Sequence, residues 1–513
     1  MNTIRKSVRS KPWLGWILFI ITAVVVFGLG LLTSTIIERR TEAQFVDKKK
    51  VDIGEFEPRN VVWGQNYPQQ YESYLAMRDT SFVSKYNGNA EIDQLEQFPA
   101  LVILWAGYGF SKDYSQPKGH VYAVKDIHES LRTGAPTGPE DGPMPATCWT
   151  CKSPDVPRLM HKIGVKEFYS GKWSRHGSEI VNPIGCADCH NEKTMDLQIS
   201  RPALIEAFER QGKDIAEATH QEMRSLVCAQ CHVEYYFNKK KPHEGVPYLT
   251  FPWDNGTTVE QVEKYYDDIN FSDWTHALSK APMIKAQHPG YEIFQTGIHA
   301  RRGVACADCH MPYQSEGGVK FSDHKIQSPL NNMANSCQVC HRESEEELTN
   351  SVYANMDRVL EIRGELEHLL VTTHLEAEFA WKKGATDEQM KDILMDIRHG
   401  QWRWDYAAAS HGAAFHAPVE TLRILSTGIQ KGNDARLKIA QLAAELGHKG
   451  NIPVADVSSK SKAQAYIGLD MDKEVSEKKK FLETLLPEWR EEAKKREDAM
   501  PQYDVNAKKV SLK

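Results

Sequence analysis

The sequence predicts a mainly α-helical protein in which short helices and loops come first and long helices follow. Two observations support this prediction. Residues 38 to about 345 hold all ten cysteines and most of the Gly and Pro, a composition typical of loop-rich structure. After residue 345, apolar residues recur at helical spacing with charged residues between them: Val352, Met356, Val359, Leu366, Leu370 and Thr373.

The N-terminal segment, residues 13–37, is almost wholly apolar and follows Arg5, Lys6, Arg9 and Lys11. A run of about 25 apolar residues is long enough to span a bilayer. A cleaved signal peptide usually has a shorter apolar core and a small-x-small site after it. We therefore expect residues 1–37 to be an uncleaved membrane anchor, and a cleaved signal segment is the alternative.

The ten cysteines form five C-x-x-C pairs with none left over. C-x-x-C-H is the attachment signature of c-type haem, in which two thiols bond to the porphyrin edge and the histidine binds iron. Four pairs end in histidine: Cys186–Cys189 with His190, Cys228–Cys231 with His232, Cys306–Cys309 with His310, and Cys337–Cys340 with His341. The fifth pair, Cys148–Cys151, ends in Lys152. We therefore expect five covalently bound haems.

Zinc sites, disulfides and thioredoxin-like redox motifs agree less well with this cysteine pattern. A zinc site needs three or four protein ligands for each metal ion and does not need histidine directly after the second cysteine. A disulfide framework would not place every cysteine three residues from its partner. A thioredoxin-like C-x-x-C normally occurs once.

Lys152 marks the haem at which we expect chemistry. A haem with two histidine ligands is coordinatively full, whereas inner-sphere chemistry needs an open position on the iron. Exchange of the proximal imidazole for an amine changes the axial ligand, one of the main controls on haem iron. The alternative is that Lys152 merely follows a degenerate motif and that a histidine from elsewhere binds this iron.

Three further helices are expected. One covers residues 202–226, one runs from about Asp387 to Gly412, and one runs from about Val419 to a break near Gly432. We divide the chain into a pentahaem region (38–345), a helical region that completes haem ligation and forms a dimer interface (346–490), and a frayed, charged tail (491–513). The net charge of −6 is mild for 513 residues and gives no reason to expect a nucleic-acid partner.

From about His120 to Pro418 the chain resembles the pentahaem cytochrome c nitrite reductases that form ammonium. The resemblance rests on the one C-x-x-C-K and four C-x-x-C-H motifs, and on three further stretches. These are Cys228-Ala-Gln-Cys231-His232-Val-Glu234-Tyr235-Tyr236-Phe237, Lys285-Ala-Gln287-His288-Pro289, and Gln401-Trp-Arg-Trp-Asp405 leading to His416-Ala-Pro418. It implies a mainly α multihaem cytochrome c fold with loops around the haems.

The resemblance also implies the second ligand of each histidine-ligated haem, from a chain with 20 histidines. The implied partners are His120 for the Cys228 haem, His299 for the Cys337 haem, His324 for the Cys186 haem and His416 for the Cys306 haem. For the last of these, the nearby His411 competes.

The resemblance further implies a catalytic group of Arg132, Tyr235 and His288 around the Lys152 haem. Arginine can bind the oxygens of an anion, and histidine can deliver protons. The alternatives are a surface salt bridge for Arg132 and core packing for Tyr235, and the adjacent Tyr236 has a similar alternative. A calcium ion would be held beside this group by the side chains of Glu234 and Gln287 and the backbone carbonyls of Tyr235 and Lys285, since calcium favours oxygen ligands.

The expected function is the six-electron reduction of nitrite to ammonium, with five haem c groups and calcium as cofactors. We expect a homodimer on the periplasmic side of the cytoplasmic membrane, which receives electrons from a membrane-bound, quinol-oxidising multihaem cytochrome. The alternatives are a reductase of hydroxylamine or sulfite, and a multihaem electron shuttle without catalysis. A shuttle would have no use for an open iron, so the Cys148 motif favours an enzyme.

Overall fold

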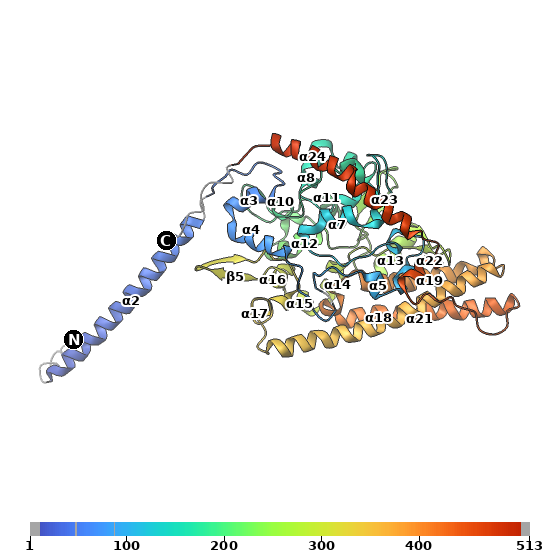
Figure 1. Cartoon of the computed structure of the whole chain (residues 1–513). Coiled ribbons are helices and arrows are strands. Elements are labelled where there is room, and N and C mark those ends of the chain that lie inside the picture. Colours follow the sequence, from blue (N-terminus) through green and yellow to red (C-terminus); the bar gives the residue numbers. More distant parts are fainter. Residues whose placement is uncertain (1–10, 47–48, 87, 504–513) are drawn as a thin grey trace.

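The protein is described here by a computed structural model that covers residues 11–46, 49–86 and 88–503. Helices dominate and strands are few, as the sequence predicts (Figure 1). Before residue 345 the helices are short: α3 Asn60–Asn66, α4 Pro68–Leu75, α5 Gln94–Gln97, α6 Ala100–Leu104, α7 Ala123–Glu129, α8 Asp155–Ile163, α9 Val165–Phe168, α10 Cys186–Cys189, α11 Pro202–Arg210, α12 His220–Ala229, α13 Val259–Asp268, α14 Gly290–Thr296, α15 Ile298–Arg301, α16 Cys306–His310 and α17 Met333–Ser336.

Within the described residues, six strands form three separate antiparallel pairs. They are β1 Tyr236–Asn238 with β2 Tyr248–Thr250, β3 Trp274–Thr275 with β4 Pro282–Met283, and β5 Tyr313–Glu316 with β6 Val319–Ser322. Pairs this small cannot form a core of their own, so they serve to fix loops between helices.

The helices after residue 345 are much longer. They are α18 Glu345–Lys382, α19 Asp387–Ala409 and α21 Pro418–Glu445, with the short α20 Ala413–His416 between the last two. α18 begins at Ser344, where the Ser344 side chain and the Glu347 carboxylate cap each other's backbone N–H groups. Of the predicted apolar stripe on α18, all members are buried except Val352, which is half-buried.

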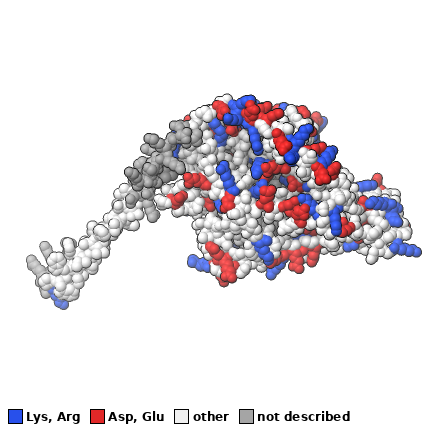
Figure 2. All heavy atoms as spheres, in the orientation of Figure 1, with Lys and Arg blue, Asp and Glu red and all other residues white. Residues whose placement is uncertain are grey.

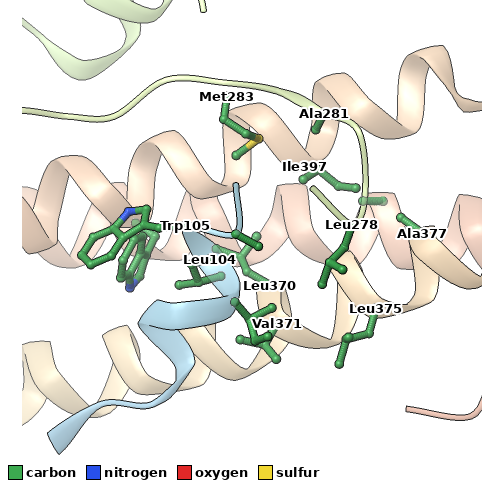
Figure 3. Packing of buried hydrophobic residues seen from close by; sticks show 14 of the residues in the cluster. Leu104, Trp105, Leu278, Ala281, Met283, Leu370, Val371, Leu375, Ala377 and Ile397 are labelled. Atoms are coloured by element: carbon green, nitrogen blue, oxygen red, sulfur yellow. The ribbon is translucent and has the colours of Figure 1, made fainter. Parts of the chain in front are cut away.

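The main apolar core lies between these long helices and the loop-rich part of the chain. Figure 3 shows Leu104 and Trp105 at the end of α6 beside Leu370 of α18, with Ile397 of α19 close by. The Trp105 and Trp404 rings lie 5.8 Å apart at the same boundary. The long helices therefore form the wall against which the segments before residue 345 pack.

The predicted break near Gly432 is wrong, because α21 continues to Glu445. A Cβ atom at Gly432 would lie 2.7 Å from the Leu369 side chain, and one at Gly428 would lie 2.6 Å from the Leu366 side chain. These glycines therefore let α21 approach α18 closely, and this packing outweighs their low helix propensity of about 1 kcal/mol each relative to alanine.

The predicted single helix over residues 202–226 is also wrong. α11 ends at Arg210, Gly212 has a φ of +69°, and a 3₁₀ turn η7 (Ile215–Glu217) precedes α12. Thr219 and Glu222 form a capping box that starts α12 afresh. Two local signals, a left-handed glycine and a helix cap, thus override the apolar periodicity.

The C-terminal part is more ordered than expected. α22 Lys460–Tyr466, α23 Met471–Glu483 and α24 Leu485–Ala499 follow α21. On α24, Trp489 is buried against Trp173 with ring centroids 5.6 Å apart, and Ala493 is also buried. The expected fraying is therefore wrong up to Ala499, and residues 504–513 lie outside the described residues.

The N-terminal helix α2, Pro12–Val46, projects away from the rest of the protein (Figure 1). Its segment Pro12–Ile37 has a mean hydropathy of 2.5 and buries none of its residues, so it is long and apolar enough to cross a membrane. Figure 2 shows this segment almost free of charged atoms, in contrast to the mixed charges of the body. Arg5, Lys6 and Arg9 of the expected basic flank lie outside the described residues.

Candidate haem sites and catalytic centre

The C-x-x-C motifs lie on or beside turns of helix. Cys186–Cys189 is α10, Cys306–Cys309 lies in α16, Cys228 lies in α12, and Cys148 lies in the 3₁₀ turn η5 (Ala146–Trp149). A helical turn places residues i and i+3 on one face, which suits two thiols that must reach one porphyrin edge. No disulfide joins any two of the ten cysteines, and the described residues contain no group of three His, Cys, Asp or Glu side chains that could hold a metal ion.

The structure brings each motif histidine close to the distal histidine expected for it. An imidazole nitrogen binds a first-row transition metal at about 2.0–2.1 Å and lies about 1.1 Å from its ring centre, so two rings on one ion should have centroids about 6.3 Å apart. The ring centroids of the expected pairs are separated by 6.3 Å for His120–His232, 6.2 Å for His190–His324, 6.2 Å for His310–His416 and 6.3 Å for His299–His341.

Hydrogen bonds orient several of these rings. The Nδ1 atoms of His190, His310 and His324 lie 2.8–2.9 Å from the backbone carbonyls of Met195, Gln327 and Ser322, respectively. A ring that donates from Nδ1 keeps Nε2 as the atom free to bind a metal ion. These residues therefore fit axial ligation of haem iron.

The other expected ligands also suit this role. Burial lowers the pKa of His120 to about 4 and that of His416 to about 3, so both rings are in the neutral form that binds metal. The Nδ1 of His416 is buried and has no hydrogen-bond partner among the described residues. His411, its competitor, lies instead 6.1 Å from His288 between ring centroids.

The motifs lie next to one another in a defined order. The thiols of Cys151 and Cys231 lie close enough to alter each other's pKa, and so do the thiols of Cys228 and Cys306. The Cys337 motif is beside Cys309, and Cys189 is close to Cys228. The Lys152 motif is thus the end of a row whose next member is the Cys228 motif.

Lys152 and Arg132 both lie close to Cys148. Burial raises the pKa of the Cys148 thiol to about 12, and the positive charges of Lys152 and Arg132 partly offset this effect. Arg132 belongs to a 3₁₀ turn, η4 (Leu131–Thr133), that is held by a hydrogen bond of 2.9 Å from the Leu131 N–H to the Asp113 carboxylate. Its guanidinium lies over the Phe110 ring at 4.8 Å from the centroid. A cation is therefore fixed beside the motif that carries the lysine.

Tyr235 and His288 approach the same motif from two other segments. Burial raises the pKa of Tyr235 well above its ordinary value, and the nearby thiols of Cys151 and Cys148 raise it further. Burial lowers the pKa of His288 well below its ordinary value, and the neighbouring Lys152 lowers it further. Tyr236 packs elsewhere, with its hydroxyl 2.8 Å from that of Tyr265. The geometry therefore favours Tyr235 over Tyr236.

The residues expected to hold calcium also lie together. The buried Glu234 carboxylate accepts hydrogen bonds from the Tyr266 hydroxyl at 2.8 Å and the Gln287 N–H at 2.6 Å. The Gln287 side-chain amide lies 3.1 Å from the Lys285 carbonyl oxygen. Calcium binds oxygens at 2.3–2.6 Å, so neighbouring ligand oxygens are about 3 Å apart. A half-turn of the Gln287 amide would exchange its nitrogen and oxygen atoms. The Gln287 side-chain oxygen would then lie at about this distance from the Lys285 carbonyl oxygen.

The carboxyl groups of Glu234, Glu292 and Asp273 lie near one another. Burial raises the pKa of Glu234 well above its ordinary value and raises those of Glu292 and Asp273 to about 7 each. The Glu292 Oε2 atom is buried without a partner among the described residues. A cation at this place would neutralise the cluster, so the donor set fits calcium.

Two residues of the site carry no expectation from sequence. Asp405 forms a buried ion pair with Lys285, and the centroid of the Phe110 ring lies 4.8 Å from the Arg132 guanidinium and 5.2 Å from the Lys285 ammonium. The sequence feature that could have identified Asp405 is the presence of a charged residue on the buried face of a predicted helix. Phe110 gives no such signal, because its importance comes from neighbours distant in the chain.

Comparison with known proteins gives one consistent result. A family model described as cytochrome c552 matches residues 60–501. A cytochrome c-552 of Bacteroides fragilis is 60% identical over 487 residues, which are 95% of this chain and 98% of that protein. One of Porphyromonas gingivalis is 58% identical over 491 residues, again 95% of this chain and 98% of the relative. Among solved structures, a cytochrome c nitrite reductase of Desulfovibrio desulfuricans, described as having two calcium sites, matches with a TM-score of 0.71 and 31% identity, over 82% of this chain and 91% of that one.

Proposed function

This chain belongs to the cytochrome c552 family, and we propose that it reduces nitrite to ammonium at the haem of the Cys148 motif. Membership of a cytochrome c family confirms covalently bound haem c as the cofactor, and five motifs provide for five haems. The observation that carries the proposal is the approach of Arg132, Tyr235 and His288 to the one motif that ends in lysine. The likeness to a solved nitrite reductase supports it.

The proposed iron ligands are Lys152 for the Cys148 haem and a histidine pair for each of the others. When bound, the haems supply electrons and, at Lys152, an iron with an open position. The four pairs are His120 with His232, His190 with His324, His310 with His416, and His299 with His341. Their ring separations, near the value for two imidazoles on one ion, support this assignment.

The residues around Lys152 bind the substrate and supply its protons. Nitrite, six electrons and eight protons give one ammonium ion and two waters, so the centre must bind an anion and deliver many protons. The Arg132 guanidinium binds and polarises the nitrite oxygens. Tyr235 and His288 donate protons to the departing oxygens and to later intermediates. The negative charge of bound nitrite raises the pKa of His288 from its low value, so that the ring can take up a proton.

We further propose a calcium ion held by the carboxylate of Glu234, the side-chain oxygen of Gln287 and the carbonyls of Tyr235 and Lys285. Glu234 directly precedes Tyr235, and Gln287 directly precedes His288. An ion bound there would fix both proton donors through their neighbours. The carboxyl groups of Glu292 and Asp273 near the buried Glu234 support this site.

The partner and location follow from the same proposal. The apolar segment of α2 anchors the protein uncleaved in the cytoplasmic membrane, with residues 38–345 as the haem region on the periplasmic side. A membrane-bound, quinol-oxidising multihaem cytochrome donates the electrons. Residues 346–490 supply His416 and a homodimer interface.

The decisive assay measures nitrite consumed against ammonium formed, with reduced viologen as electron donor. We expect one ammonium for each nitrite. Tests with hydroxylamine and sulfite separate the two other reductase activities. The visible spectrum of the oxidised protein separates an enzyme from a shuttle, because a shuttle would show five low-spin haems and no high-spin haem.

A further inference from the structure

Arg201, the residue that precedes α11, is a buried arginine directed at the backbone around Lys152. Its side chain is 1% exposed. The Nε donates a hydrogen bond of 2.7 Å to the Thr150 carbonyl, and an Nη2 hydrogen bond of 2.8 Å goes to the Ser153 carbonyl. Only Cys151 and Lys152 lie between these two residues. The guanidinium therefore holds the chain on both sides of the lysine.

The same guanidinium contacts the Cys186 motif directly and is linked to the Cys228 motif through a hydrogen-bond network. It pairs with the Asp188 carboxylate inside the Cys186 motif, and its Nη1 donates to the Ser200 hydroxyl at 2.7 Å. The Asp188 carbonyl accepts hydrogen bonds from the Ser200 hydroxyl at 2.6 Å and from the Gln230 amide at 2.9 Å. Gln230 lies inside the Cys228 motif. One continuous network thus joins three of the five motifs.

Arginine is needed at this position for a geometric reason. Its planar fork presents N–H groups in several fixed directions, so it can bind two carbonyls and a carboxylate at once. A lysine ammonium has the same charge but reaches these acceptors less well from one point. Buried carbonyls left without a donor are costly, so they would draw the Lys152 segment into another conformation.

We propose that Arg201 is a positioning residue for the lysine-ligated haem: it holds the Thr150–Ser153 backbone so that the Lys152 amine meets the iron. This role rests on the proposed function, in which Lys152 is an iron ligand. It also makes the Lys152 segment rigid relative to the adjoining Cys186 and Cys228 motifs.

The test is Arg201→Lys in the full-length holoprotein, with Arg210→Lys on the adjoining helix as the matched control. Arg210 binds Asp254 and the Phe251 carbonyl, away from the motifs. Haem is counted on each motif by mass spectrometry of haem peptides, and the high-spin haem is followed by electron paramagnetic resonance and redox titration. Nitrite kcat and KM are measured separately.

We expect Arg201→Lys to keep four unchanged low-spin haems while the high-spin signal splits into several forms and its midpoint potential shifts. The nitrite kcat should fall by roughly tenfold or more, as for loss of other groups that orient a metal ligand, with KM changed less than about threefold. Loss of haem from Cys148 and Cys151 alone would support the same role. Arg210→Lys should match the wild type.

Three results would overturn the proposal or the function on which it rests. A variant with five haems and an unchanged high-spin signal would show that Arg201 does not position the lysine. Loss of all haems, or of the protein, would assign Arg201 a general structural role instead. Wild-type protein that shows the high-spin haem but does not reduce nitrite would refute the proposed function and leave the spectroscopic comparison intact.

Discussion

The ammonium group of Lys285 lies 2.7 Å from the carboxylate of Asp405, and both side chains are almost completely buried. The second Asp405 oxygen accepts the Ala286 N–H at 3.1 Å. Helix α19 therefore holds two consecutive residues of the segment that continues into Gln287 and His288. The ion pair fixes the carbonyl proposed as a calcium ligand and the histidine proposed as a proton donor.

Asp405→Asn should lower both stability and activity. Removal of one charge from a buried pair leaves the Lys285 ammonium without a counter-charge, which costs about 3 kcal/mol. We expect a lower thermal midpoint, weaker calcium binding and reduced nitrite turnover with five haems retained. Asp268→Asn, at the exposed pair with Lys264, is the control and should change stability by less than about 1 kcal/mol. Equal effects of the two substitutions would contradict a special role for Asp405.

Lys152→His should keep all five haems and lower nitrite turnover by roughly tenfold, which corresponds to about 1.4 kcal/mol of barrier. The reason is that the axial ligand sets the electronic character of the iron, while the surrounding scaffold is unchanged. Haem content and turnover are measured on the same preparation. Full activity in a correctly assembled variant would show that the lysine has no functional part.

Glu234→Ala should remove bound calcium and with it most of the activity. Without the ion, Tyr235 and His288 lose the support that adjoins each of them, while the four low-spin haems keep their spectra. Metal analysis and turnover before and after chelation provide the measurement, and Glu260→Ala on α13 is a control for the substitution itself. The site is refuted if wild-type protein contains no calcium and chelation leaves turnover unchanged.

Arg132→Gln should raise the KM for nitrite and also lower kcat, because the guanidinium both binds the anion and stabilises the departing oxygen. Hydroxylamine is neutral near pH 7, so its reduction should suffer less. The quantity to compare is the ratio of the two activities in the wild type and the variant. An equal fractional loss for both substrates would mean that Arg132 does not recognise the anion.

Phe110→Leu should raise the KM for nitrite, but by less than Arg132→Gln does. The ring lies beneath the Arg132 guanidinium, and a cation–π contact of this kind is worth about 0.5–1 kcal/mol, or roughly two- to fivefold in affinity. The expected result is a nitrite KM raised by that factor with hydroxylamine kinetics little changed. Phe208→Leu, which removes a distant ring beside Lys213, is the matched control. If both variants behave alike, the stacking on Phe110 does not tune Arg132.

Helix boundaries show where local sequence signals suffice and where they do not. The apolar stripe of α18 and the start of α19 at Asp387 follow from local periodicity and from a capping box at Thr386 and Gln389. The continuation of α21 through Gly432 does not follow from such signals, because the low helix propensity of glycine predicts a break at this position. The contact with Leu369 that favours glycine there comes from another helix.

The sequence by itself determined the cofactor chemistry and the position of the odd haem motif, because thiol attachment depends on residues only three or four apart. It also determined the mainly helical fold and the apolar N-terminal segment. Only the tertiary structure brings His324 to 6.2 Å from His190, places Asp405 against Lys285, and lets Arg201 reach both sides of Lys152. These relationships join segments far apart in the chain, and such contacts are set by how whole helices and loops pack rather than by spacing along the sequence.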